Sequence, residues 1–311
     1  MKFSRKQFIS TFIIFILTSL YFNKVQSQDF ISFIREVDNY KRSTRLNENF
    51  NDIDSTTFNL EEYLGKYDKI KIKNGYLLDY KYFDNSLDGK PYIYAKTDTF
   101  ILEDFLKQET LKHIPVDTIY KHKVKIYHKV PFDFLNNNND PKEYKIWYHP
   151  DSYDFVFHRK LYKFLTDSVN RGYNYIIPVD SKEGYFQYLY FKEYGEQFCT
   201  KWHEAYNSKR IILNKDEILK LIKNYSREEF CKKSEFQKLK NLRQIIPNPQ
   251  IELSENYCRI TLVEEEFYGI YKRTYRINRT FPYLIKVEYE NKLVEICPSI
   301  MFWREYLQSM N

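Results

Sequence analysis

Residues 251–296 run IELSENYCRITLVEEEFYGIYKRTYRINRTFPYLIKVEYENKLVEI, and this stretch decides the fold class. Its last part alternates in period two, which is typical of a strand with one face buried. The alternation predicts that an inner set faces the core while Lys286 and Glu288 face solvent; the inner set is Tyr283, Ile285, Val287 and Tyr289. We expect the whole stretch to form a meander of antiparallel strands.

Similar extended patterns occur earlier in the chain. Ile70 and Ile72 alternate with lysines in residues 68–73, Asn74-Gly75 follows, and residues 76–83 form a second extended run. Two such runs around Asn-Gly predict a β-hairpin. Further strands are predicted over residues 92–96, 121–130, 144–148, 173–179, 185–191, 197–206 and 211–213.

Helices are predicted between these groups of strands. The longest covers about 153–171, with an apolar stripe and with Gly172 at the position of a C-terminal cap. Two more cover about 215–224 and about 227–243, the second starting at a capping box of Ser226 and Glu229. Short helices are expected near residues 30–37, 59–64 and 99–108. The predicted class is α+β, a largely antiparallel sheet with a few segregated helices.

Residues 1–27 have the pattern of a cleavable secretory signal peptide. Three basic residues precede an apolar run over residues 8–22, and Val25 and Ser27 occupy the −3 and −1 positions of a cut before Gln28. The alternative, an uncleaved anchor, needs about 20 apolar residues, more than this run provides. We predict a secreted or periplasmic protein that meets a membrane only during export. Residues 28–311 then form one exported α+β domain, with a subdivision near residue 172 as the alternative.

Composition argues against several functional classes. Loss of the four basic residues of the signal segment lowers the formal net charge from +7 to +3, so a nucleic-acid partner is not expected. Only 7 glycines occur and no Gly-rich phosphate-binding motif is present, so no cofactor is predicted. Aromatic residues make up 19% of the chain, led by 30 Tyr. Aromatic packing in a β-rich core accounts for this richness, and a ligand-stacking surface is the alternative.

Histidines and acids suggest a few sites for chemistry. His122 and His128 share one face of a predicted strand, but six residues of strand span about 20 Å, too far for one ion. No metal site is therefore predicted. His149 and Asp151 precede the long helix, at a junction where active sites often lie. Helix capping explains Asp151 equally well.

Trp202-His203-Glu204 is the cluster with the strongest claim to a test. On a helix, Cys199 and His203 would be neighbours, as a thiol nucleophile and its base require; on a strand they would lie about 13 Å apart. The strand interpretation is favoured, with Trp202 in the core and His203 and Glu204 at its rim. Trp202 and Tyr206 are then candidate binding residues, and His203 and Glu204 are weak catalytic candidates beside His149 and Asp151.

Four cysteines lie in the last part of the chain, at spacings that match no zinc motif. In an exported protein an even number suggests up to two disulfides, and buried free thiols are the alternative. Cys258 opens the predicted meander and Cys297 closes it, so these two are the predicted bridge.

Three functions remain open at this level. The first is a non-catalytic protein that binds an unknown ligand or protein partner through an aromatic-rich β surface. The second is an exported hydrolase with a dispersed active site, and the third is a structural cell-envelope component. Convergence of titratable side chains in a pocket would favour the hydrolase, whereas an exposed aromatic patch would favour the binding protein.

Overall fold

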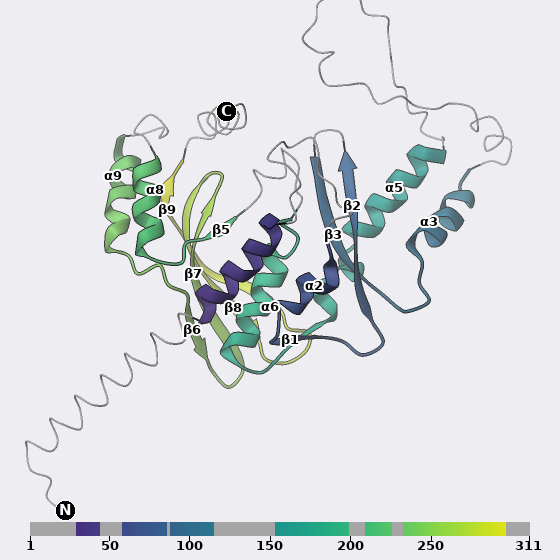
Figure 1. Cartoon of the computed structure of the whole chain (residues 1–311), viewed down its shortest axis with the longest axis horizontal. Helices are drawn as coiled ribbons and strands as arrows, with labels where there is room; N and C mark the ends of the chain where they lie inside the picture. Colours follow the sequence, from purple (N-terminus) through teal and green to yellow (C-terminus); the bar gives the residue numbers. More distant parts are fainter. Residues whose placement is uncertain are drawn as a thin grey trace, which may run out of the picture.

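A computed structural model describes residues 29–43, 58–85, 88–114, 153–198, 209–225 and 233–296. It confirms the α+β class, with antiparallel sheets and helices in separate groups (Figure 1). Within these ranges no helix combines the length and the apolar character that crossing a membrane requires. The predicted signal segment and the predicted strands over residues 121–130 and 144–148 lie outside the described residues, as does most of 197–206.

The C-terminal meander is confirmed as the main sheet. Its strands follow the order β5-β7-β8-β9, and β6 also pairs with β7. The strands are β5 (Arg210–Ile211), β6 (Gln250–Leu253), β7 (Tyr257–Glu266), β8 (Gly269–Asn278) and β9 (Ile285–Glu295). Every pairing is antiparallel. Side chains that alternate along β7 and β8 enter the largest core cluster, as a half-buried sheet requires.

The predicted inner face of the last strand is wrong in its middle. Val287 and Tyr289 are each 52% exposed, although they were expected to face the core. β9 lies at the edge of the sheet, and its register with β8 shifts between Thr274 and Tyr275. Such an irregularity changes which side chains face the core, so the simple alternation does not hold along the strand.

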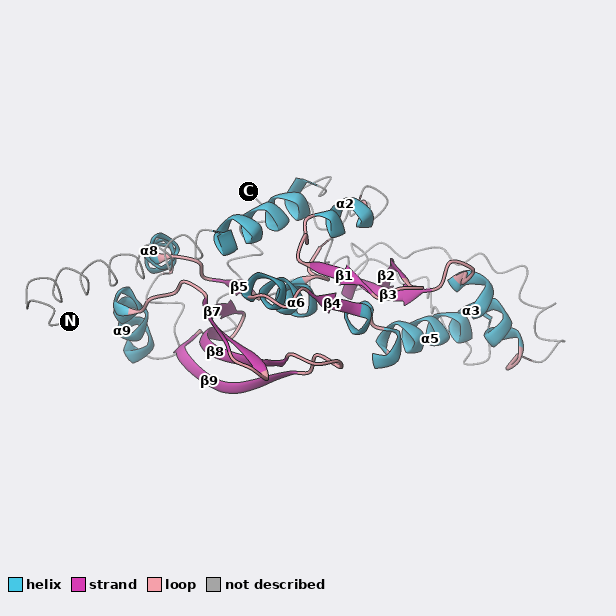
Figure 2. Ribbon diagram, turned by 90° about the horizontal axis from the view of Figure 1, so that it is seen from below, coloured by secondary structure: helices cyan, strands magenta, loops and turns pink. Residues whose placement is uncertain are grey.

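Helix α6 (Lys182–Tyr194) replaces the strand predicted over residues 185–191. The Ser181 side chain accepts a hydrogen bond from Gly184 N at 3.0 Å and caps the helix. Residues 184–191 are buried on all sides, because α6 lies between the helix of residues 29–43 and the β7–β8–β9 sheet (Figure 2). A helix without a polar face shows no 3.6-residue period, and its many aromatic residues resemble a strand instead.

The helix of residues 29–43 crosses α6 and buries the face that the sequence predicted. Phe30, Ile34 and Val37 lie in the main core, and the Phe30 and Phe186 rings are 4.8 Å apart between centroids. Helix α2 (Leu60–Gly65) packs nearby, at the position of a predicted short helix, and Asn59 caps it.

The predicted hairpin around Asn74-Gly75 is wrong in its pairing, although both of its strands exist. Tyr76 N donates to Lys73 O at 3.1 Å and Gly75 has a φ of 83°, so a turn does form here. Lys73 N, however, donates to Tyr175 O at 2.7 Å rather than to the strand that follows.

The strands on either side of this turn find separate partners. β1 (Ile70–Ile72) pairs with β4 (Ile176–Pro178), and β2 (Leu77–Asn85) pairs with β3 (Asp88–Lys96). The strand predicted over residues 173–179 is shortened to β4, because residues 172–175 form a 3-10 turn. A local turn signal marks a change of direction, while packing between distant segments chooses the partner strand.

The β2–β3 ribbon packs against two helices, α3 (Leu102–Leu111) and α5 (Tyr153–Thr166), around a small separate core. The long helix was predicted to continue to about residue 171, but α5 ends at Thr166 and Asp167 caps a following 3-10 turn. Gly172 is therefore not a helix cap. It is buried against Ile93, where an added Cβ would lie 2.8 Å from a side-chain carbon.

Two further helices cover the other end of the main sheet. α8 (Lys215–Asn224) matches its prediction, and Asn214 caps it. α9 (Lys233–Asn241) and a 3-10 turn (Leu242–Gln244) fall within the predicted helix over about 227–243. The predicted capping box of Ser226 and Glu229 lies outside the described residues. These helices enclose a second core with Val263, Ile270 and Val294.

Candidate functional site

Most of the site residues predicted from sequence lie outside the described residues. These are His149, Asp151, Trp202, His203, Glu204, Tyr206 and Cys297. The structure neither brings them together nor separates them, so their catalytic and binding roles stay predictions.

Cys258 is described, and it is a fully buried free thiol near the start of β7. Burial raises the pKa of this thiol to about 12, so it is a poor nucleophile at neutral pH. The bridge to Cys297 stays a prediction.

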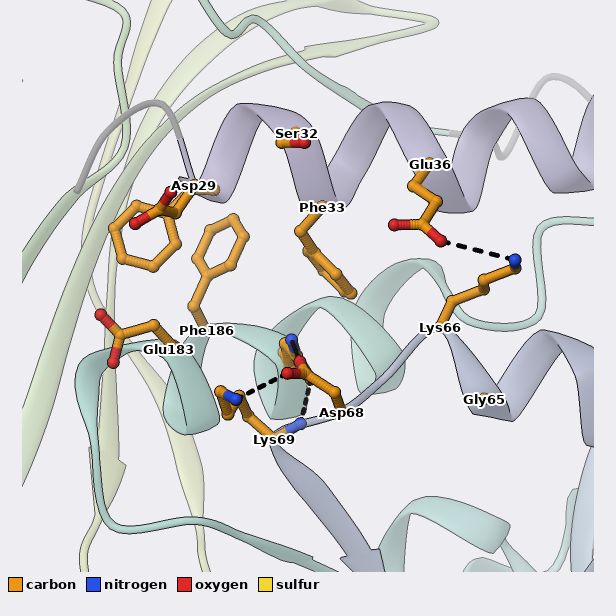
Figure 3. A pocket seen from close by; sticks show the side chains of 12 residues that line it. Asp29, Ser32, Phe33, Glu36, Gly65, Lys66, Asp68, Lys69, Glu183 and Phe186 are labelled. Carbon is orange, nitrogen blue, oxygen red and sulfur yellow. Dashed lines mark hydrogen bonds and ion pairs between the residues drawn. The ribbon is translucent and has the colours of Figure 1, made fainter. Parts of the chain in front are cut away.

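Two surface depressions are candidates for a functional site. The first, called here the charged groove, lies between the helix of residues 29–43, the α2–β1 connection and the start of α6 (Figure 3). Its volume is about 480 Å³, and carboxylates and lysines line much of it.

Ion pairs within the charged groove neutralise its lysines. Lys66 Nζ lies 3.4 Å from a Glu36 carboxylate oxygen, and Lys69 Nζ lies 2.6 Å from Asp68 (Figure 3). Hydrogen bonds from Lys69 and from the Gln187 amide lower the pKa of Asp68. A carboxylate held ionised in this way is a weak proton acceptor, so the groove is poorly suited to general acid–base catalysis.

The second depression, called here the aromatic groove, surrounds the connection between β8 and β9 (residues 279–284). The connection contains a cis peptide bond at Phe281-Pro282, and Asn278 N closes it by donating to Leu284 O at 3.1 Å. The Arg279 guanidinium donates to both carboxylate oxygens of Asp180, at 2.9 and 2.6 Å. The connection is therefore held at both of its ends.

Helix α6 forms one wall of the aromatic groove. Tyr188 and Lys192 lie four residues apart, which places them on the same side of the helix. The Tyr188 hydroxyl donates to Tyr283 O at 3.1 Å, and the two rings meet nearly edge to face at 5.9 Å. This contact fixes Tyr283 against the helix.

The end of the β1–β4 ribbon forms the opposite wall. Tyr175 contacts Tyr76, with ring centroids 4.4 Å apart, and its hydroxyl donates to Val169 O at 3.1 Å. Lys73 Nζ lies 5.5 Å from the centroid of the Phe281 ring, within the range of a cation–π contact.

Phe281 and Tyr283 divide the aromatic groove into two pockets. One has a volume of about 200 Å³ and contains Lys192; the other has a volume of about 170 Å³ and contains Lys73. Both pockets also touch Asn174. Phe281 itself is 62% exposed, so much of its ring is open to a ligand beside its contacts with Lys73 and Tyr283.

The aromatic groove carries positive charge with no carboxylate among its described lining residues. Lys192 is partly buried, and burial lowers its pKa below the usual lysine value. Within the described part of the chain, neither Lys192 nor Lys73 forms an ion pair. Among the described residues the groove is thus an aromatic surface with two lysines that form no ion pair, although Glu193, next to Lys192 in the chain, opposes the lowering of its pKa.

A third cluster of ionisable groups is fully internal. Glu264 is completely buried, accepts hydrogen bonds from Tyr194 and Tyr275, and forms a 3.0 Å ion pair with Arg273. These partners satisfy the carboxylate away from solvent, as a buried charge requires. The cluster joins α6 to the sheet and has a structural role.

The aromatic groove could not be predicted from local sequence, because its residues come from four separate segments. The one local signal was Phe281-Pro282 between two strands, where Phe281 is exposed. Among the described residues, no group of three or more His, Cys, Asp or Glu side chains is placed to hold a metal ion. Comparison of the chain with protein-family models, with curated proteins and with solved structures found no match.

Proposed function

We propose that this protein is an exported, non-catalytic binding protein that holds its ligand in the aromatic groove. The observation that carries the proposal is the exposed Phe281 ring between two pockets, each with an unpaired lysine. Binding sites combine apolar walls with a few placed polar groups, and this groove has that composition.

The polar groups of the aromatic groove favour binding over catalysis. The Tyr188 and Tyr175 hydroxyls are occupied by main-chain oxygens, and burial raises the pKa of both. They are therefore poor proton donors at neutral pH. The described residues that line the Lys192 pocket include no acid or histidine, and the neighbouring Glu193 is paired with Lys209 at 2.5 Å, so proton transfer lacks a partner in the pocket.

An anionic aromatic dye, 1-anilinonaphthalene-8-sulfonate, tests the site directly. We expect one saturable site on the folded protein and a loss of about tenfold or more in affinity with Phe281→Ala, by analogy with stacking contacts worth about 1–3 kcal/mol. Tyr268→Ala is the matched control, because Tyr268 is 56% exposed but belongs to the β7–β8 turn. Equal dye affinity in the two variants would exclude the aromatic groove as the binding site.

The hydrolase alternative rests on His149, Asp151, His203 and Glu204, and it is tested separately. Ester, peptide and glycoside reporter substrates are incubated with the exported protein and with its H149A, D151N, H203A and E204Q variants. Turnover that any of these substitutions abolishes would replace the binding proposal with an enzymatic one.

Export is tested by intact-mass analysis of protein recovered outside the cytoplasm. We expect a mature chain that begins at Gln28, because the cut-site pattern places cleavage after Ser27. Material outside the cytoplasm that retains residues 1–27 would contradict the cleavage.

A further inference from the structure

We infer that the aromatic groove binds an acidic oligosaccharide, with one sugar ring in each pocket and its acidic groups at Lys73 and Lys192. The inference rests on the proposed function and names the ligand class. Three features of the groove lead to this inference: two lysines without ion pairs among the described residues, two pockets of similar volume, and the Asn174 side-chain oxygen as a hydrogen-bond acceptor.

Positive charge selects an anion. Lys73 and Lys192 lie in different pockets, and the described residues that line both pockets include no acid. Partial burial makes the Lys192 ammonium costly on its own, and an anionic ligand would offset that cost. Within the described chain, a neutral ligand would leave both cations with only their contacts to aromatic rings, such as Phe281 for Lys73 and Tyr173 for Lys192.

Duplication of the pocket selects a repeating ligand. The two pockets are similar in volume, about 200 and 170 Å³, and each combines one lysine with its own tyrosine. Tyr188 belongs to the first and Tyr175 to the second, while Phe281 and Tyr283 serve both. A chain in which every unit has one ring and one acidic group could place one unit in each pocket.

Asn174 favours a sugar over an acidic peptide. Its side-chain amide nitrogen donates to Ser168 O, which leaves its Oδ1 as an acceptor beside both pockets. Sugar hydroxyls on the ring itself can donate to this oxygen, whereas an acidic peptide has only its main-chain N–H groups to donate, because ionised Asp and Glu side chains bring only acceptors. The apolar face of a sugar ring can also lie against the exposed Phe281 ring.

Calorimetric titration of the full mature chain with a trigalacturonate tests the inference. The methyl ester of the same trisaccharide keeps the rings and removes the charge, and we expect it to bind at least about tenfold more weakly, as loss of charge-assisted contacts implies. We expect Lys192→Gln to weaken binding of the acid about tenfold and the more exposed Lys73→Gln about threefold.

Lys71→Gln is the matched control, because Lys71 is an exposed lysine of β1 that lines neither pocket. We expect it to change the affinity less than about twofold, in line with surface charges that make no contact. Raising the salt concentration should weaken the acid more than the ester, because exposed charges are screened.

Three results would overturn the inference while leaving the proposed function intact. Equal affinity for acid and ester would show that charge does not select the ligand. Tighter binding of polyglutamate than of trigalacturonate would assign the groove to an acidic peptide. Absence of trigalacturonate binding by protein that still binds the dye at Phe281 would exclude the saccharide. Failure of the proposed function is a different result, namely dye binding that Phe281→Ala leaves unchanged.

Discussion

The charged groove and the aromatic groove are built on the first and second halves of the same helix, α6, and they use their lysines differently. In the larger, charged groove Lys66 and Lys69 are paired with acids of the groove itself. In the smaller, aromatic groove Lys73 and Lys192 have no such acid among the described residues. Charge that is already paired offers little to a ligand, so volume alone is a poor guide to the binding site.

The two grooves also differ in how their walls are held. The aromatic groove is fastened by main-chain contacts, such as Tyr188 to Tyr283 O and Asn278 N to Leu284 O. In the charged groove Lys69 N donates to the Gln187 side chain at 2.8 Å, but Glu36 is 59% exposed in its pair with Lys66. A rigid wall lowers the entropic cost of binding, which again favours the aromatic groove.

The largest expected effect is on the free energy of unfolding, and it comes from disturbing α6, the helix that both grooves share. An alanine Cβ at Gly184 would lie 2.0 Å from Val179 O, a main-chain atom that cannot move alone. We expect Gly184→Ala to lower the free energy of unfolding by about 3 kcal/mol, the upper range for an overpacked core. Gly65→Ala is the control, since nothing lies within 4 Å of the added carbon. Urea unfolding curves measure both, and equal midpoints would contradict the packing of α6.

A smaller effect is expected on the pH dependence of dye affinity, which depends on Lys192 of the aromatic groove. Burial lowers the pKa of Lys192 below 10.5, and only its charged form attracts an anion. Affinity for the sulfonate dye, which stays ionised, should therefore be highest near neutral pH and should fall as the pH rises toward 10.5. Lys192→Gln should weaken dye binding about tenfold at neutral pH. The remaining fall in affinity should then occur at a higher pH, near the pKa of an ordinary lysine. Fluorescence titrations measure the profile, with circular dichroism to show that the fold persists.

An identical alkaline profile in wild type and Lys192→Gln would show that Lys192 does not contact the bound anion. Lys73, in the second pocket of the aromatic groove, would then be the lysine that attracts the anion.

The smallest effect is expected in the charged groove. Lys66→Gln breaks a solvent-exposed pair with Glu36, and such pairs contribute about 0–1 kcal/mol. We expect a change of less than about 0.5 kcal/mol in the free energy of unfolding and no change in dye affinity. Thermal unfolding and dye titration of this one variant test both points. Weakened dye binding would show that the charged groove takes part in recognition and would break the contrast between the two.

Several elements follow from local sequence alone. The helix at 215–224 matches its predicted bounds because Asn214 caps it, and Ile218 is buried as its apolar pattern indicates, whereas Leu221 rather than Leu219 completes the buried face. The C-terminal meander was predicted from the period of two in its last part, and it forms although that alternation fails at Val287 and Tyr289; β7 and β8 alternate between buried and half-buried side chains. The α+β class rests on these periodic segments.

Tertiary structure decided what local patterns do not encode. The helix of residues 29–43 and the sheet cover α6 from both sides (Figure 2), so its buried residues form no polar face. The sequence of α6 therefore lacks the 3.6-residue alternation of apolar and polar residues that would indicate a helix. The Asn74-Gly75 turn exists, yet the partner of β1 is β4, a strand about a hundred residues away in the chain. The aromatic groove brings Lys73, Tyr175, Lys192 and Phe281 together only through these long-range pairings. Local sequence determines the period and caps of each element, whereas the burial of distant surfaces against one another determines partners, and the candidate site depends on the partners.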